Sequence, residues 1–248
     1  MIIDSHVHLG KSIFGYELTL EKLLSTMEEY QIDYSVICPN QPRTYHLEPE
    51  NDYIASVAEA HSNLIGFARV DPRQEEKAID EVSRAISKLG LKGVFLHPWE
   101  EGYRVNSESV VAVVEKATEL GVPVMIASGY PWLSHALQVA DVASEVPNAT
   151  IIMTNGGQIN ISGMAQADAY LAMEKQPNLY VETSGVYRQD FIENCIEKFG
   201  SSRVLFGSNS PRMNQGFELE RAKSATKKNS EKQKDVLGYS MARILNLV

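Results

Sequence analysis

Two histidines separated by one residue stand near the start of the chain, where residues 4–10 read DSHVHLG. The apolar residues before them predict a strand. Side chains alternate along a strand, so His6 and His8 should point to the same side. Two neutral imidazoles side by side suit Zn²⁺ or another borderline divalent ion. The alternative is a hydrogen-bonded pair of core histidines without a metal.

Eight short apolar runs rich in β-branched residues recur along the chain, and amphipathic stretches separate them. The predicted strands are residues 2–5, 34–38, 64–70, 93–97, 123–127, 150–154, 179–183 and 204–207. Thr19 and Ser107 are expected to cap helices, and Gly90, Gly121 and Gly200 are expected to end them. Apolar strands that alternate with amphipathic helices predict a parallel sheet covered by helices.

Eight such units in 248 residues fit a single (β/α)₈ TIM barrel that spans residues 1–248. An open doubly wound sheet is the alternative, but no G-x-G-x-x-G follows the first strand. Active sites of such barrels lie at the C-terminal ends of the strands, where His6 and His8 stand. This position favours a functional pair over a structural one.

The segment around the two histidines resembles the start of the amidohydrolase-related branch of the amidohydrolase superfamily, the branch similar to dihydroorotases and decarboxylases. Further similar segments follow along the chain at residues 93–99 (GVFLHPW), 122–126 (VPVMI), 151–157, 180–185 (YVETSG), 204–208 (VLFGS) and 238–245. The resemblance covers nearly the whole chain. It implies a TIM barrel that acts on a small molecule, and it also implies a homodimer.

Three positions depart from that family's metal site. The fifth and sixth strands usually end in histidine ligands, and here these positions hold Ala127 and Asn155. The eighth strand usually carries an aspartate that binds metal and accepts a proton from water, and here the residue is Asn209. Alanine has no ligand atom, and the asparagine amide is a poor zinc ligand and no base. We therefore expect His6 and His8 to bind a divalent ion, preferably zinc, weakly or not at all.

Other polar residues at strand ends are candidates for catalysis. His97 ends the fourth strand, where it either completes a three-histidine site or contacts substrate or structure. Glu182, near the end of the seventh strand, is a base or a ligand if it points inward. Asn209 is the third catalytic candidate, through a carbonyl contact or a bound water. The acidic pair Glu100 and Glu101 is more typical of a solvated loop.

Three loops after the fifth, sixth and seventh strands are rich in hydrogen-bonding groups. Their side chains are predicted to line one substrate pocket with the histidines, namely Tyr130, Trp132, Asn155, Gln158, Asn160, Tyr187 and Arg188. Arg188 is suited to hold a carboxylate through two hydrogen bonds. Its equally weighted alternative is a salt bridge with Asp190 or Glu193.

Composition excludes several other functions. The net charge of −9 argues against nucleic-acid or anionic-membrane partners, because both need clustered Lys and Arg. Cys38 and Cys195 belong to no paired motif and are interpreted as small buried hydrophobes. No segment has the roughly 18 apolar residues of a membrane span, and none resembles a signal peptide, so a cytoplasmic protein is expected.

Two classes of function remain open. The first is a hydrolase that acts on a small cyclic amide, lactone or carboxylated substrate, with a weakly bound metal or none. The second is a binding or regulatory protein that has kept the barrel and lost its chemistry. A decarboxylase or hydratase of the same family is a third reading.

Overall fold

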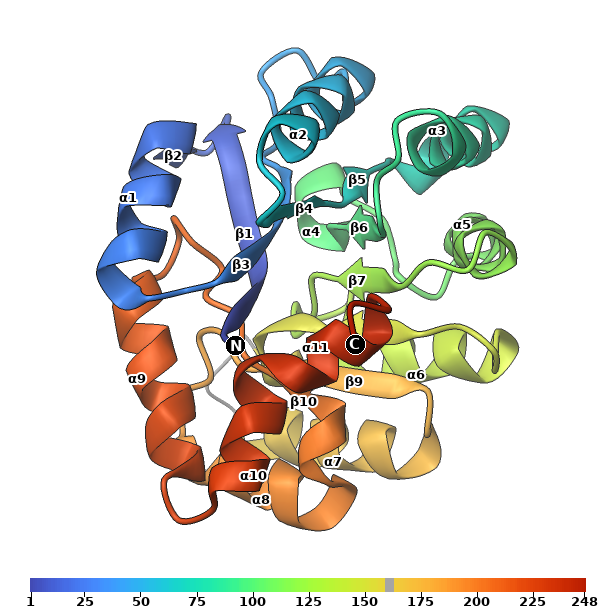
Figure 1. Cartoon of the computed structure of the whole chain (residues 1–248). Helices are drawn as coiled ribbons and strands as arrows, with labels where there is room; N and C mark the ends of the chain where they lie inside the picture. Colours follow the sequence, from blue (N-terminus) through green and yellow to red (C-terminus); the bar gives the residue numbers. More distant parts are fainter. Residues whose placement is uncertain (159–162) are drawn as a thin grey trace.

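A computed structural model describes residues 1–158 and 163–248 of the chain, and Figure 1 shows the strands at its centre with helices around them. The parallel strands are β1 (Ile3–Lys11), β3 (Tyr34–Pro39), β4 (Leu64–Gly66), β5 (Ala68–Arg69), β6 (Val94–Leu96), β7 (Val124–Ile126), β8 (Ile151–Met153), β9 (Leu179–Glu182) and β10 (Val204–Leu205). A short strand, β2 (Glu17–Leu18), pairs with the end of β1 in antiparallel orientation.

The strands form two sheets, in the orders β2-β1-β3-β4 and β10-β9-β8-β7-β6-β5. Only Phe67 separates β4 from β5, and its N–H donates to the carbonyl of Ile37 at 2.9 Å. The third strand of the barrel thus passes from one sheet to the other. At the second seam, the N–H of Ser5 donates to the carbonyl of Phe206 at 3.0 Å, and the N–H of His8 donates to that of Ser210 at 2.7 Å.

These contacts carry the parallel strand order from β1 through β10 and back to β1. The arrangement is the (β/α)₈ TIM barrel that the alternation of strands and helices predicts. The third strand is divided into β4 and β5, which accounts for nine parallel segments in eight strand positions. The runner-up, an open doubly wound sheet, is wrong because the first and last strands are neighbours.

Helices lie around the strands in Figure 1. They are α1 (Leu20–Tyr30), α2 (Glu48–Ala60), α3 (Glu76–Ser87), α5 (Glu108–Glu119), α6 (Ala136–Glu145), α7 (Gly163–Lys175), α8 (Gln189–Phe199) and α9 (Gln215–Thr226). A single turn, α4 (Pro98–Glu101), follows β6. The chain ends with α10 (Ser230–Lys234), a π-helical turn (Asp235–Tyr239) and α11 (Ser240–Ile244), packed near the chain start.

The helix boundaries follow the local signals in the sequence. The hydroxyl of Thr19 accepts a hydrogen bond from the N–H of Lys22 and so caps α1, as predicted. Gly200 ends α8 with a positive φ of 88°, also as predicted. The first strand is longer than predicted, because the backbone of β1 remains paired with β3 as far as Leu9 and then with β2.

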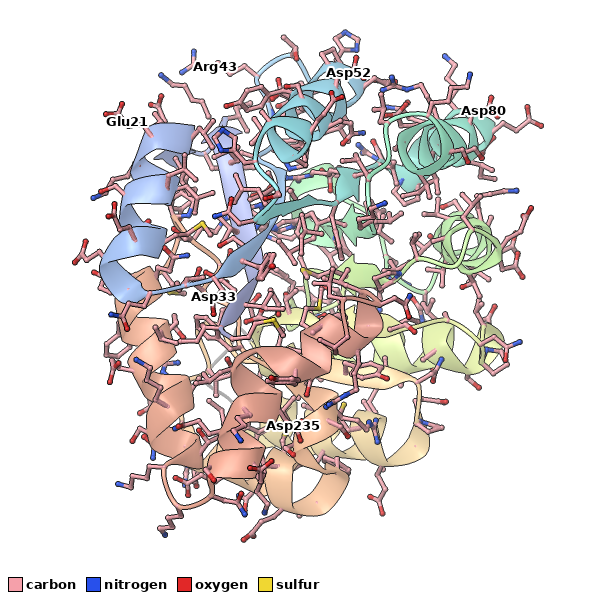
Figure 2. The ribbon with its side chains drawn as sticks, viewed as in Figure 1. Glu21, Asp33, Arg43, Asp52, Asp80 and Asp235 are labelled. Atoms are coloured by element: carbon pink, nitrogen blue, oxygen red, sulfur yellow. The ribbon has the colours of Figure 1, made fainter. Side chains whose placement is uncertain are left out.

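Figure 2 shows the charged side chains of Glu21, Arg43 and Asp80 pointing away from the barrel. The apolar faces of the helices pack on the strands in one continuous core, which includes Val7, Ile37 and Val94. In the described ranges, no helix combines the length and the hydropathy that crossing a membrane requires.

Gly93, just before β6, tests how tightly this core is packed. A Cβ at this position would lie 2.4 Å from the ring of the fully buried Phe67. We expect Gly93→Ala to lower the free energy of unfolding by about 1–3 kcal/mol, because the ring must move in a packed interior. Urea unfolding measures the change. Gly163→Ala is the control, since no atom of the described residues, apart from its chain neighbours and its own helix backbone, lies within 4 Å of the added Cβ. Equal losses in the two variants would contradict the packing argument.

Candidate active site

The two histidines of β1 lie together in the interior of the barrel. Both are 1% exposed, and their Nε2 atoms are 2.9 Å apart. The register of β1 against β3 shifts between Asp4 and Val7, so this segment is not a regular strand. Both rings contact the ring of Phe95, with centroids 5.6 Å and 5.0 Å away.

A chain of polar contacts runs through the histidine pair. On one side, His6 Nδ1 lies 3.1 Å from the carboxylate oxygen Oε2 of Glu182. On the other, His8 Nδ1 lies 3.4 Å from Sγ of Cys38. The short distance between the Nε2 atoms places one proton between them, so one imidazole donates to the other. Three strands, β1, β3 and β9, thus contribute to a single buried chain.

Glu182 points inward, which decides the alternative that the sequence leaves open. Its carboxylate accepts hydrogen bonds from the N–H and the hydroxyl of Ser184, the latter at 2.8 Å, and from the N–H of Asn155 at 3.3 Å. Gly207 leaves room for it, because a Cβ there would lie 2.6 Å from Oε1 of Glu182. Every neighbour that contacts the carboxylate is a donor, so the carboxylate acts as the acceptor for His6 Nδ1 as well.

His97 lies next to the pair but is engaged differently. Its ring centroid is 6.5 Å from that of His8, and its Nδ1 accepts a hydrogen bond from the N–H of Glu100 at 3.3 Å. It therefore caps α4. Burial lowers the pKa of His8 and of His97 well below the usual value, and the positive charges of Arg69 and Arg212 lower both further. Both imidazoles are accordingly neutral at neutral pH.

A buried group of charges adjoins the histidines, and the sequence analysis missed it. Arg69, fully buried, donates to Glu101 at 2.8 Å and to Glu100 at 2.6 Å. Arg212 donates to the second oxygen of Glu100. The prediction of a solvated acidic loop is wrong, because the side chains of both glutamates are 1% exposed and paired with guanidinium groups. The sequence signal that could have revealed this buried group is the position of Arg69 at the end of a predicted strand.

Cys38 is the other missed residue. It is buried, as the sequence predicts, but it also contacts His8 and the carbonyl of Val7. Burial raises the pKa of its thiol to about 12, so the group stays protonated and can donate. The sequence signal that could have revealed this contact is the position of Cys38 at the end of the second barrel strand.

The structure brings only part of the predicted substrate pocket to the histidines. The ring of Tyr130 lies 5.5 Å from that of His97, and Asn155 contacts Glu182 and Ser184. Gln158 is buried two residues beyond Gly156, with its side-chain nitrogen unpartnered among the described residues. Asn160 lies outside the described residues.

Three predicted pocket residues lie elsewhere. Trp132 is 82% exposed and borders a surface hollow with Arg104 and His135. Tyr187 is exposed, and Arg188 pairs with Asp190 at 2.8 Å, which is the alternative that the sequence allowed. In the part of the chain that the structure describes, no hydrogen bond or ring contact joins these three to the histidines.

The donor set does not fit a tightly bound divalent ion. The two Nε2 atoms that converge already share a proton, and His97 uses Nδ1 for its cap. Ala127 offers no ligand atom, while the side-chain oxygen of Asn155 accepts from Thr154 and that of Asn209 from Arg212. Over residues 1–158 and 163–248, no group of three or more His, Cys, Asp or Glu side chains is arranged to hold a metal.

A hollow of about 600 Å³ lies away from this cluster. It is bordered by α2, residues 88–92 and the start of β4, at the N-terminal ends of the strands. That end of such barrels contributes to stability rather than to catalysis. The histidine cluster is therefore the candidate active site.

Glu182→Gln tests the buried chain of contacts. The new amide places an NH₂ group among donors, so we expect a loss of about 1–3 kcal/mol in unfolding free energy. We also expect a shift of the His6 Nδ1–H signal in ¹⁵N NMR spectra. Glu193→Gln, on the exposed face of α8, is the control and should change neither. A native His6 signal in Glu182→Gln would show that the contact is not a hydrogen bond.

Solved structures with the same fold include enzymes with several activities. The chain matches 2,6-dihydroxybenzoate decarboxylase from Rhizobium with a TM-score of 0.78 and 17% identity, covering 99% of this chain and 98% of that one. It matches 5-carboxyvanillate decarboxylase from Novosphingobium aromaticivorans, complexed with manganese and a nitrobenzoic acid, with a TM-score of 0.80, 14% identity and coverages of 99% and 96%. It also matches 4-oxalomesaconate hydratase from Rhodopseudomonas palustris, with a TM-score of 0.73, 18% identity and coverages of 99% and 96%.

At these identities the likeness shows the fold. No protein of curated function matches the sequence. The family model described as "Amidohydrolase" matches residues 3–246, which is nearly the whole chain. The chain therefore belongs to the amidohydrolase family.

Proposed function

We propose that this chain is a hydrolase that acts on a small cyclic amide, lactone or carboxylated substrate at the C-terminal mouth of its barrel, without a tightly held divalent ion. The observation that carries the proposal is the contact between His6 and Glu182 within the buried chain of polar groups. A carboxylate behind a histidine orients the ring and stabilises the imidazolium that forms when the ring accepts a proton. This arrangement supports general acid–base catalysis by the histidines.

The neighbouring groups support the same chemistry. His8 and His97 are neutral because burial lowers their pKa, which weakens them as bases. Proton uptake by the cluster therefore depends on the carboxylate of Glu182 beside His6. Asn209 has no ionisable group, so the histidines replace the aspartate that serves as the base in related proteins. Asn155 and Tyr130 lie nearby, and we assign them to substrate binding through hydrogen bonds. His97 and Asn209 are assigned to polarise or orient the substrate.

Decarboxylation or hydration is the second candidate. It is supported by the solved structures above, two of which are named decarboxylases and one a hydratase. Both reactions also need a positioned acid or base. The predicted homodimer and cytoplasmic location stay predictions.

An activity screen distinguishes these readings. The chelator-treated chain is incubated with lactones, cyclic amides and aromatic carboxylic acids, and ring opening and CO₂ release are measured separately. We expect ring opening that falls at least 100-fold in His8→Asn and Glu182→Gln, because removing an acid–base group costs about 10²–10⁴-fold. His46→Asn, an exposed histidine, is the control. Release of CO₂ alone would favour the second candidate, and activity that survives both variants would refute the proposal.

Metal content is a separate prediction. Two ligands are too few for zinc, which usually takes three from the protein at catalytic sites, so we expect well under one zinc or manganese per chain after dialysis. Content should rise with pH, because an ion must displace the proton between His6 and His8. The combined variant Ala127→His, Asn155→His and Asn209→Asp should bind more. One tightly held ion in the native chain would show that the ligand set is larger than His6 and His8.

A further inference from the structure

Arg69 and Arg212 share one carboxylate, yet their surroundings differ. Arg69 is fully buried, and its guanidinium donates to Glu101, to Glu100 and, at 3.2 Å, to the carbonyl of Pro39. These bonds use four of its five N–H groups, and the side chain is fully buried, so a ligand does not reach it. Arg69 therefore serves to hold the turn α4 against the barrel.

Arg212 has few acceptors. In the described ranges its guanidinium donates to Glu100 and, at the long distance of 3.4 Å, to Oδ1 of Asn209. A guanidinium has five N–H donors, so three of them have no protein acceptor among these residues. The side chain is 11% exposed, which leaves one side open to solvent. A small molecule can therefore approach this guanidinium, in contrast to that of Arg69.

The surroundings of Arg212 are those of the candidate active site. Its guanidinium carbon lies 5.3 Å from the ring centroid of the half-exposed Tyr16. Glu100, its partner, follows Trp99, whose ring stacks on that of Tyr130 with centroids 5.5 Å apart. Tyr130 in turn contacts His97. Arg212 thus lies beside aromatic rings that border the histidines.

Arg212 shares its carboxylate partner with a second cation. Among the described residues it pairs with Glu100, which also pairs with Arg69, while Glu101 pairs with Arg69. Burial raises the pKa of Glu101, which disfavours its charged form. An anion beside Arg212 would supply the guanidinium with a carboxylate that it does not have to share.

We propose that Arg212 binds the carboxylate of the substrate, with Glu100 holding the guanidinium in place beside His97 and Tyr130. This inference rests on the proposed function and narrows its substrates to small carboxylates. It replaces Arg188, for which the sequence weighed carboxylate binding and a salt bridge equally, because Arg188 is exposed and already paired with Asp190. A planar guanidinium recognises a carboxylate through two parallel hydrogen bonds, and its open N–H groups allow this geometry.

The test uses benzoate and its uncharged isostere benzamide as probes. The chain has two tryptophans, so Trp132→Phe leaves Trp99 as the single indole reporter beside Tyr130. Fluorescence titrations in that background give the two dissociation constants. We expect benzoate to bind more tightly than benzamide. Arg212→Met should weaken benzoate about tenfold or more and leave benzamide unchanged, because a hydrogen-bonded charge is lost.

Two further variants make the result decisive. Arg43→Met removes an exposed arginine that points away from the barrel in Figure 2, and it should change neither constant. Arg212→Lys keeps the charge without the planar fork and should lose a smaller factor, which decides the question if Arg212→Met does not fold. The proposal would be overturned if the chain bound benzoate and benzamide with equal affinity, or if Arg212→Met lost the same affinity for both. It would also be overturned if Arg188→Ala, and not Arg212→Met, weakened the binding of benzoate.

The titration requires no turnover, so the two proposals fail separately. Benzoate binding through Arg212 in a chain that hydrolyses nothing would support the carboxylate site and refute the hydrolase. Hydrolysis of uncharged and carboxylated lactones with equal efficiency, unchanged by Arg212→Met, would support the hydrolase and refute the carboxylate site.

Discussion

The seam between β1 and residues 206–210 is the constraint on which the site depends. Backbone hydrogen bonds cross it from Ser5, from His8 and, to the carbonyl of His6 at 2.7 Å, from Asn209. The buried carboxylate of Asp4 adds a bond from the N–H of Ser208 at 2.8 Å. Because these bonds join the first strand to the last, they place Asn209 beside His6 and bring Arg212 next to Glu100.

Burial of polar groups sets the character of the histidine cluster. An unpaired polar group in the interior costs free energy, so the two imidazoles, the thiol of Cys38 and the carboxylate of Glu182 are stable there only as partners of one another. The side chain of Asn155 is likewise held by Thr154 and Ser184. Hydrogen bonds between neighbouring side chains thus satisfy the polar atoms of the cluster.

The arginines supply positive charge at the same end of the barrel. Their interaction with Glu100 and Glu101 is strong because it lies out of water. Burial, together with the positive charge of the two arginines, keeps His8 and His97 neutral. Unlike a metal ion, a guanidinium is a fixed positive charge of the protein and needs no ligands. It does not activate water, and it is not released with the product. The acid–base work that the proposed function requires therefore falls to the histidines.

The sequence by itself determined the barrel, the family and the common location of His6 and His8, because these depend on local periodicity and on a motif within one strand. From Ala127, Asn155 and Asn209 it also predicts an incomplete metal site, which stays a prediction. Only the tertiary structure decided that Glu182 points inward and that Cys38 contacts His8. It also decided that Arg212, rather than Arg188, has open donors beside the site. Each of these facts depends on which side chains from distant strands meet in a buried space, and residue spacing carries no information about such meetings.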